Sequence, residues 1–275
     1  MKIAIQGGLG SYSHIAAVSI FGKNIELMQE DTFEDAIAKC KTKEVDYSVI
    51  PFENSTHGSV IENFDLLTKY ELAIVKEIYL KIHFHLMVNR GVEFKDIKNL
   101  YTHRVSISQI RKFIESNHQI HTHIYSDNGK AAEYIKKEHL TNSAAAASKL
   151  AAELFDLEII KHNIHDNPKN YTRFFVLSRQ KHYPQDADKT SISFIVKHET
   201  GSLVKALSCF SDEGISLTKI ESRPIIGSDW EYIFYVDLLA GINNPIMQNA
   251  IKSASRCTIE LKILGSYKQG IYIDT

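Results

Sequence analysis

The first half of the chain alternates between short apolar runs and longer segments in which apolar residues recur every three or four positions. Apolar runs bounded by polar residues predict β-strands, and the longer spacing predicts amphipathic helices. Strands are predicted at residues 2–6, 25–29 and 47–52, and helices at residues 14–22, 32–42 and 60–70. Because strands and helices alternate, we expect an α/β fold with a mainly parallel sheet covered on both faces.

The pattern continues with a strand-rich passage and then changes near residue 180. Further strands are predicted within residues 72–88 and at 100–103, 121–126 and 157–164, and helices at 108–117, 129–138 and 148–155. The polar stretch at about 180–190 is typical of a linker. Beyond it, a strand, a helix, two strands (the first at 215–226), a helix and a strand follow over residues 191–267. This order predicts a ferredoxin-like α+β domain. We therefore expect one domain over residues 1–182 and a second over residues 190–269.

Composition narrows the class of protein. Of the 275 residues, 44% are hydrophobic and 24% are charged, and the net charge is -1, which favours a globular protein and argues against nucleic acid or an anionic membrane as a partner. The apolar runs are too short to span a bilayer, and the start of the chain has no signal-peptide anatomy. Cys40, Cys209 and Cys257 lack zinc or disulfide spacing. We expect a cytoplasmic protein.

Two polar loops follow predicted strands and precede predicted helices. The first, "IQGGLGSYSH", has Gly8 and Gly10 in the dinucleotide-binding pattern, but Ser13 stands at the third glycine position. It is either an anion-binding loop or a tight turn capped by Ser11 or Ser13. The second, "VIPFENSTHGSV", is either a ligand loop or a self-capped polar turn. Because both follow strands of one parallel sheet, we expect them to face the same crevice.

Two further features raise questions of chemistry. In "YTRFF", Thr172 and Arg173 lie side by side at the entry to an apolar run, where polar side chains need partners. The pairs His83 and His85, and His121 and His123, have a His-x-His spacing that could place both imidazoles on one face of a strand. A metal site needs further ligands in matching positions, so we expect no metal.

Five segments together resemble prephenate dehydratase: "GSYSHIAA", "PFENSTHGSV", "NYTRFFVLS", "GSLVKAL" and "ISLTKIESRP", in that order along nearly the whole chain. The resemblance implies a two-lobed catalytic domain like a type 2 periplasmic binding protein over residues 1–182. It also implies a C-terminal ACT domain, over residues 190–269, that senses phenylalanine. No chorismate mutase segment precedes Met1, which favours the monofunctional form. We expect a homodimer or homotetramer with prephenate as substrate and no cofactor.

The same resemblance suggests roles for the site residues. Thr172 would help the C4 hydroxyl of prephenate to leave, and Arg173 would either bind a substrate carboxylate or form a structural ion pair. Phe174 would pack the floor of the cleft, while Asn54, Ser55 and Ser11 would contact and orient the substrate. Glu53 would serve as an acid if burial raised its pKa, or would hold its loop in shape.

Two segments depart from the family pattern. Where the family has Ser-His-Pro-Gln followed by Gln-Cys, this chain has "YTHRVSISQI", with Thr102 at the serine position and Gln109 at the glutamine position, both expected to be catalytic. In the ACT segment Ser216 replaces the usual asparagine. The effector-binding residues implied by the resemblance are Gly201, Ser202, Leu203, Val204, Ser216, Leu217, Glu221, Ser222, Arg223 and Pro224.

Three alternatives stay open at this point. A dehydratase that prefers arogenate, or accepts both substrates, would carry the same motifs. A non-catalytic amino-acid sensor would keep the cleft and the ACT domain without turnover. A nucleotide-dependent oxidoreductase would use the glycine loop, although that loop lacks the third glycine.

Overall fold

A computed structural model describes residues 1–225, 227–228 and 231–274. Ile226, the last residue of the strand predicted at 215–226, lies outside this described part. Backbone contacts divide the chain into two units, one made of residues 1–63, 78–174 and 271–275 and the other of residues 64–77 and 175–270. Neither unit is one continuous segment of the chain. The predicted boundaries at 1–182 and 190–269 stay a prediction, and residues 179–188 contain no helix or strand.

The first lobe of the first unit contains the predicted parallel strands. β1 (Lys2–Gln6) pairs in parallel with β2 (Glu26–Glu30) and with β3 (Tyr47–Asn54), and the connections are α1 (Tyr12–Phe21) and α2 (Phe33–Lys41). The hydroxyls of Ser11 and Thr32 cap these helices by accepting the backbone N–H of His14 and Asp35. The capping prediction for both helices is confirmed.

Strands from distant parts of the sequence complete this sheet. Its order runs β5 (Ala73–Lys81), β11 (Tyr171–Ser178), β3, β1, β2; β16 (Ile271–Ile273) pairs with β5, and β4 (Gly58–Ser59) pairs with β3. α3 (Ile61–Tyr70) follows β4. Because β11 lies between β5 and β3, residues near 172 come to lie beside residues near 54. β16 was missed by the sequence analysis.

The second lobe is built on a five-stranded sheet in the order β10 (Glu158–Lys161), β6 (His85–Val88), β9 (Ser143–Ala147), β7 (Asn99–His103), β8 (His121–Tyr125). β7 is parallel to β8 and β9, whereas β6 is antiparallel to β9 and β10, so the expectation of a mainly parallel sheet was wrong for this lobe. β9 was missed because its sequence, Ser-Ala-Ala-Ala-Ala, has low strand propensity; all five residues are buried.

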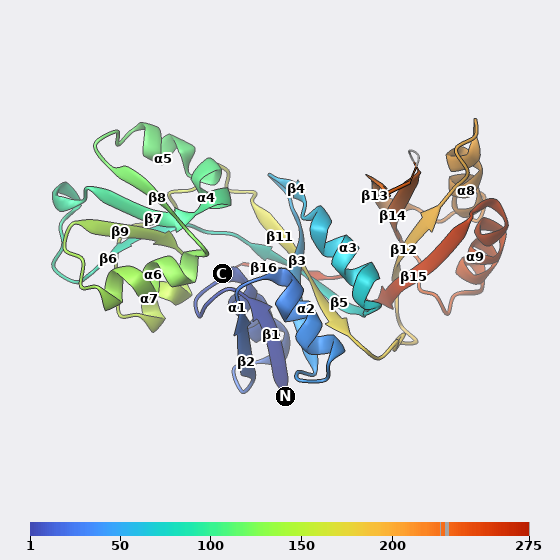
Figure 1. Cartoon of the computed structure of the whole chain (residues 1–275), viewed down its shortest axis with the longest axis horizontal. Coiled ribbons are helices and arrows are strands. Elements are labelled where there is room, and N and C mark those ends of the chain that lie inside the picture. The colour runs from blue at the N-terminus through green and yellow to red at the C-terminus, as the bar shows by residue number, and fades with distance from the viewer. Residues whose placement is uncertain (226, 229–230, 275) are drawn as a thin grey trace. The chain divides into compact units, whose positions relative to one another are not determined.

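Helices cover this second sheet. They are α4 (Arg104–Gln109), α5 (Arg111–Glu115), α6 (Asn128–Lys137) and α7 (Lys149–Leu154), with a 3₁₀ turn at Phe94–Asp96. α6 and α7 lie together on one face (Figure 1). The single helix predicted at 108–117 is instead two short helices, because the backbone of Ile110 leaves the helical region. That break ends α4 at Gln109.

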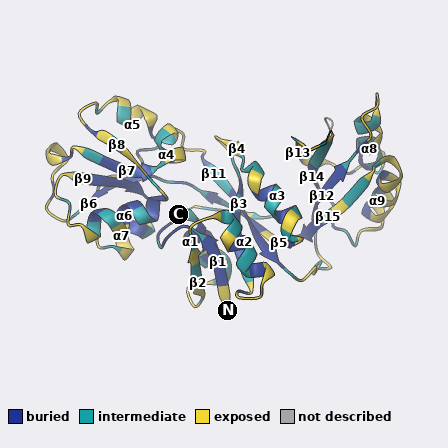
Figure 2. Ribbon diagram, viewed as in Figure 1, coloured by how far each residue is buried: buried dark blue, intermediate teal, exposed yellow. Residues whose placement is uncertain are grey.

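Two chain segments connect the lobes, residues 82–84 and residues 162–170. They are hydrogen-bonded to each other: the N–H of Ile82 donates to the carbonyl of Asn170, and the N–H of Ile164 donates to the carbonyl of Phe84, both at 2.8 Å. The predicted two-lobed catalytic fold is confirmed. The inner strands of both sheets are largely buried, whereas the edge strands β2, β8 and β10 contain only exposed and half-buried residues (Figure 2).

The second unit has the predicted strand and helix order. Its elements are β12 (Lys189–Ile195), α8 (Ser202–Ser211), β13 (Leu217–Pro224), β14 (Tyr232–Leu238), α9 (Pro245–Cys257) and β15 (Glu260–Tyr267). The sheet order is β13-β14-β12-β15, all antiparallel, with α8 packed against α9. Residues such as Phe194, Phe210 and Met247 fill the space between sheet and helices. None of the described helices is long and apolar enough to cross a membrane.

Among the described residues of the second unit, Lys189 and Glu77 form a buried ion pair that the sequence analysis did not predict. Lys189 Nζ lies 3.0 Å from Glu77 Oε1, and the two side chains are 3% and 0% exposed. The N–H of Gly270 also donates to Glu77 Oε1, at 3.0 Å. Since buried charges are costly unless paired and hydrogen-bonded, this pair ties residue 77 to β12.

We predict that Lys189→Met lowers the free energy of unfolding by about 3–5 kcal/mol, because it removes a positive charge from beside a buried carboxylate. The double variant Glu77→Met/Lys189→Met should lose less than the sum of the two single variants. Chemical denaturation followed by circular dichroism measures all three. Purely additive losses would contradict the pairing.

Candidate active site

A cleft of about 370 Å³ lies in the first unit and is lined by residues from both lobes. Its apolar walls are formed by Tyr12, Phe33, Pro51, Val60, Ile82, Phe84, Val105 and Phe174. Its polar lining is formed by Gln6, Ser11, Ser13, Asn54, Glu62, His103, Ser106, Gln109, Ser126, Asp127, Asn128 and Thr172. The glycine loop, the loop after β3 and the start of β11 therefore meet at one cleft, as expected from the parallel strands of the first lobe.

The alternation of β11 separates the polar pair that opens it. Thr172 and Phe174 line the cleft, whereas Arg173 is 3% exposed and is not among the lining residues. Arg173 Nη1 lies 3.5 Å from Glu53 Oε2, and the guanidinium lies 5.8 Å from the centre of the Tyr79 ring. Because successive strand residues face opposite sides, Thr172 and Arg173 cannot both reach into the cleft. The geometry favours the structural alternative for Arg173.

The half-buried carboxamide of Asn54 orients Thr172. Asn54 Oδ1 accepts the backbone N–H groups of Thr56 and His57, at 2.9 and 3.1 Å. A backbone N–H can only donate, so the Asn54 amide is oriented with Nδ2 on the other side. Nδ2 donates to Thr172 Oγ1 at 3.0 Å. Thr172 accepts this bond, which leaves its own hydroxyl proton available to donate to a group in the cleft.

Asn170 connects this carboxamide to the second lobe. Asn54 Nδ2 also donates to Asn170 Oδ1 at 2.8 Å, and Asn170 Nδ2 donates to Gln109 Oε1 at 2.9 Å. Asn170 is only 2% exposed. The end of α4 is thus held beside the start of β11. The sequence analysis named Asn54, Gln109 and Thr172 but missed Asn170. In the sequence, Asn170 is one of several polar residues in "HDNPKN", and only the fold places it at the cleft.

Thr102, expected to be catalytic, lies beneath the cleft. It is fully buried, does not line the cleft, and donates to Asn128 Oδ1 at 2.9 Å. Asn128 Oδ1 also accepts the N–H of His103 and the hydroxyl of Ser106, at 2.9 and 3.1 Å. Asn128 lines the cleft. The geometry therefore favours a role for Thr102 in holding Asn128. The sequence analysis missed Asn128, which begins α6 and belongs to none of the motifs.

Two other predicted residues hold the loop after β3. The Ser55 hydroxyl donates to the Lys169 carbonyl at 3.1 Å and accepts the Tyr171 N–H at 2.9 Å, and neither Ser55 nor Glu53 lines the cleft. Glu53 is partly exposed and faces Arg173. The geometry therefore favours loop-holding over substrate contact for both. Ser11 does line the cleft, while capping α1.

The glycine loop forms a tight turn whose amides already have partners. The N–H groups of Gly8, Leu9 and Gly10 donate to Asp127 Oδ2, Gln29 Oε1 and His14 Nδ1, at 3.1, 3.0 and 3.0 Å. A Cβ on Gly10 would lie 2.7 Å from Ala151, so the loop packs closely against the second lobe. Amides bound to protein groups do not offer a pyrophosphate cradle. This geometry removes the support for the oxidoreductase alternative.

The polar lining of the cleft consists mostly of uncharged groups, together with the carboxyl groups of Glu62 and Asp127. Among the described lining residues there is no lysine or arginine. Burial lowers the pKa of His103, which keeps its imidazole uncharged near neutral pH. Burial also raises the pKa of Tyr12, whose hydroxyl donates to the His83 carbonyl at 2.6 Å. The N-terminus of α1 supplies a favourable field for an anion here, whereas the N-terminus of α6 is capped by the carboxyl group of Asp127.

The histidine pairs have structural partners. His83 Nε2 lies 2.7 Å from Asp274 Oδ1, and His123 Nε2 lies 2.8 Å from Asn99 Oδ1. His85 packs edge-on against His162, and burial lowers its pKa to about 4. Within the described residues, no three His, Cys, Asp or Glu side chains are grouped so that they could hold a metal ion.

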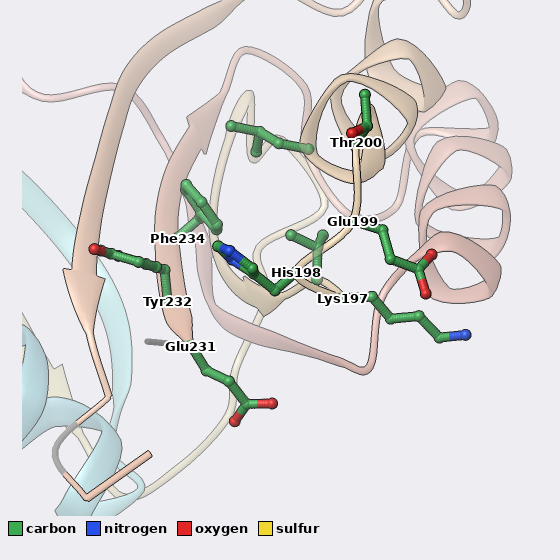
Figure 3. A pocket seen from close by; sticks show the side chains of 9 residues that line it. Lys197, His198, Glu199, Thr200, Glu231, Tyr232 and Phe234 are labelled. Atoms are coloured by element: carbon green, nitrogen blue, oxygen red, sulfur yellow. The ribbon is translucent and has the colours of Figure 1, made fainter. Parts of the chain in front are cut away.

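A second cavity, of about 450 Å³, lies in the second unit (Figure 3). Tyr232 and Phe234 enter it from β14, and the segment that leads into α8 contributes Lys197, His198, Glu199 and Thr200. Val196, Leu203 and Glu231 complete the lining. Of the ten predicted effector-binding residues, only Leu203 lines this cavity.

The other predicted effector residues lie in two separate places. Gly201 caps α8 with a left-handed backbone (φ 82°), and Ser202, Leu203 and Val204 form the first turn of that helix. Leu217, Glu221, Ser222, Arg223 and Pro224 lie on β13, an edge strand, and Ser216 directly precedes it. Arg223 Nη2 lies 2.5 Å from Asp65 Oδ2 of α3. The structure does not unite the two segments in one pocket of the described residues.

Comparison with known proteins identifies the family. The family model described as prephenate dehydratase matches residues 3–182. A bifunctional chorismate mutase/prephenate dehydratase of Pseudomonas aeruginosa is 32% identical over 272 residues, which cover 98% of this chain and 74% of that protein. A structure of prephenate dehydratase from Arthrobacter aurescens in complex with L-Phe is similar with a TM-score of 0.90 at 26% identity, covering 98% of this chain and 90% of that one.

A third similar structure has a different printed activity. It is GqqA, described as a novel type of quorum quenching acylase, with a TM-score of 0.89 at 29% identity and 98% of each chain covered. The fold alone therefore does not settle the reaction, and the chemistry has to be argued from the cleft. The family match over residues 3–182 and the long alignment above 30% identity nevertheless agree, and this chain belongs to the prephenate dehydratase family.

Proposed function

We propose that this chain converts prephenate to phenylpyruvate, carbon dioxide and water. In this reaction the bond between the ring and its carboxylate breaks, the electron pair moves through the ring, and the C4 hydroxyl leaves as water after it gains a proton. Aromatisation of the ring drives the step. The observation that carries the proposal is the Thr172 hydroxyl, which Asn54 holds as a donor toward a cleft whose polar lining is mostly uncharged.

Thr172 is the group that we assign to the departing hydroxyl. A threonine hydroxyl is a weak acid, but the N–H that Asn54 donates to its oxygen makes its proton a better donor. The expected contribution is a hydrogen bond that strengthens as negative charge develops on the leaving oxygen. Phe174, on the same face of β11, packs beside it and excludes water from the reacting ring.

The described residues that line the cleft include no lysine or arginine, so other groups have to bind the two carboxylates of prephenate. The first turns of α1 and α6 present Ser11, Ser13 and Asn128 at the cleft, and α1 adds the positive end of its helix dipole. Neutral donors bind an anion without neutralising it. A carboxylate held in this way remains ready to leave as carbon dioxide.

Thr172→Ala tests this assignment directly. We expect kcat for phenylpyruvate formation to fall by at least ~100-fold, the lower end for loss of a general-acid contribution, while Thr172→Ser retains most of the rate. Thr141→Ala, at an exposed loop position, is the control. A near-wild-type rate for Thr172→Ala would overturn the assignment. Arogenate should be run beside prephenate, and turnover of arogenate alone would favour the alternative substrate.

Arg173 should affect stability more than catalysis. Because its side chain lies away from the cleft and beside Glu53 and Tyr79, Arg173→Met should leave KM within about threefold and lower the free energy of unfolding by about 1–3 kcal/mol. Kinetics and thermal unfolding of the same preparation separate these effects. A large rise in KM with unchanged stability would restore the role of Arg173 in binding a substrate carboxylate.

We also propose that L-phenylalanine regulates this chain as a homodimer or homotetramer. The support is the ferredoxin-like second unit, the two effector segments, and the fact that they occupy separate places in one chain, as expected if an interface between protomers joins them. Arg223 of β13 pairs with Asp65 of α3, and Glu62 in the first turn of that helix lines the cleft. α3 thus gives an effector on β13 a covalent route to the cleft. None of the three cysteines, all of which lie in the described part of the chain, forms a disulfide, and this supports a cytoplasmic location.

A phenylalanine titration of the phenylpyruvate assay tests the regulation. We expect inhibition in the wild type and a response at least about fivefold weaker in Asp65→Asn, the lower end of common allosteric coupling, because this change removes the ion pair that joins α3 to β13. Glu62 and the cleft are untouched, so the rate without phenylalanine should stay near that of the wild type. A flat wild-type response would exclude phenylalanine as an inhibitor.

A further inference from the structure

The series of hydrogen-bonded amide side chains at the cleft continues to His57, a histidine that lies outside the cleft. Gln109 Nε2 lies 3.1 Å from His57 Nδ1, and His57 Nε2 lies 2.6 Å from Ser108 Oγ. The Ser108 hydroxyl in turn donates to the Val105 carbonyl at 2.7 Å. His57 belongs to the turn between β3 and β4 in the first lobe, whereas Ser108 and Gln109 end α4 in the second. Neither His57 nor Ser108 lines the cleft.

Backbone groups at both ends of this hydrogen-bond series fix which side chain donates and which accepts in each bond. At one end, two backbone N–H groups orient the Asn54 amide, so that Asn54 Nδ2 must meet Asn170 Oδ1. Asn170 Nδ2 then meets Gln109 Oε1, which leaves Gln109 Nε2 to donate to His57 Nδ1. At the other end, the Val105 carbonyl can only accept.

The tautomer of His57 follows from this direction. Since Nδ1 accepts from Gln109, the imidazole proton is on Nε2 and is donated to Ser108 Oγ, whose own proton goes to Val105. The Thr56 hydroxyl lies 3.0 Å from the same Nδ1 and 2.7 Å from Asn54 Oδ1, and it fits this assignment because both neighbours are acceptors for its single proton. Every bond in the series then has one donor and one acceptor.

We propose that His57 is a positioning residue for the dehydratase reaction, an inference that rests on the function proposed above. Its Nδ1 holds Gln109 Nε2, so Gln109 Oε1 faces Asn170, and Asn170 Oδ1 in turn holds the Asn54 amide that orients Thr172. If the Gln109 amide turned over, Nε2 would face Asn170 Nδ2, donor against donor. His57 also joins the turn after β3 to the end of α4, which holds the two lobes at the spacing that the cleft needs.

Paired variants of His57 separate hydrogen bonding from bulk. His57→Leu removes both ring nitrogens, whereas the amide of His57→Gln can accept from Gln109 and donate to Ser108. We expect His57→Leu to lower kcat about 10–100-fold with KM changed less than about threefold, since misplacing a catalytic group by about 1 Å can cost that much. His57→Gln should stay within about threefold of the wild type. His118→Leu, a change at an exposed histidine of the second lobe, is the matched control.

The outcomes distinguish this inference from the proposed function. Absence of phenylpyruvate formation by the wild type would overturn the function itself. An active wild type with His57→Leu near the wild-type rate, or with His57→Gln as impaired as His57→Leu, would overturn the role of His57. If His57→Leu does not fold, Ser108→Ala tests the same role, because it removes the acceptor of the His57 Nε2–H. We expect Ser108→Ala to lower kcat by about two- to fivefold without a change in KM.

The tautomer has a readout that does not depend on activity. Nitrogen-15 NMR of the imidazole rings in the full chain, above the pH range in which histidine is charged, distinguishes a protonated Nε2 from a protonated Nδ1. The resonance that disappears in His57→Gln identifies this ring. We expect the Nε2–H form in the wild type, and a protonated Nδ1 would overturn the direction of the whole series.

Discussion

The cleft depends on the two backbone N–H groups that hold the side-chain carbonyl of Asn54. These donors, from Thr56 and His57, leave the Asn54 amide only one orientation, and from it follow the bonds to Thr172, Asn170 and Gln109. A threonine hydroxyl that accepts one bond is free to donate its proton elsewhere. Its availability to a leaving hydroxyl is therefore a consequence of how the turn after β3 closes, and not of the threonine alone.

The two faces of the sheet that contains β11 differ in where they carry positive charge. The face of β11 that carries Thr172 meets a cleft without a lining cation among the described residues, while the other face buries Arg173 beside Glu53. An arginine in the cleft would bind a carboxylate strongly and would also stabilise it against loss as carbon dioxide. Neutral donors and helix N-termini hold an anion with less of that penalty.

Helix α3 carries residues of both units. α3 begins at the cleft with Glu62 and carries Asp65, which Arg223 of β13 contacts. The buried pair of Lys189 and Glu77 ties the middle of β5 to β12 in the same unit. The proposed effect of phenylalanine on the rate requires that its binding change the contact of Arg223 with Asp65.

The alternation of apolar runs, the helix caps at Ser11 and Thr32, and the strand and helix order of residues 191–267 are local properties, and the sequence by itself determined them. It also placed Asn54, Gln109 and Thr172 at a common site through their motifs. It could not find β9, whose alanines form a strand only because they are buried on both sides, nor choose between the two roles of Arg173. Asn170, His57 and Asn128 became site residues only through tertiary contacts across about 25 to 120 positions. The direction of a hydrogen bond depends on what lies at the far end of the series, and only the folded chain brings those ends together.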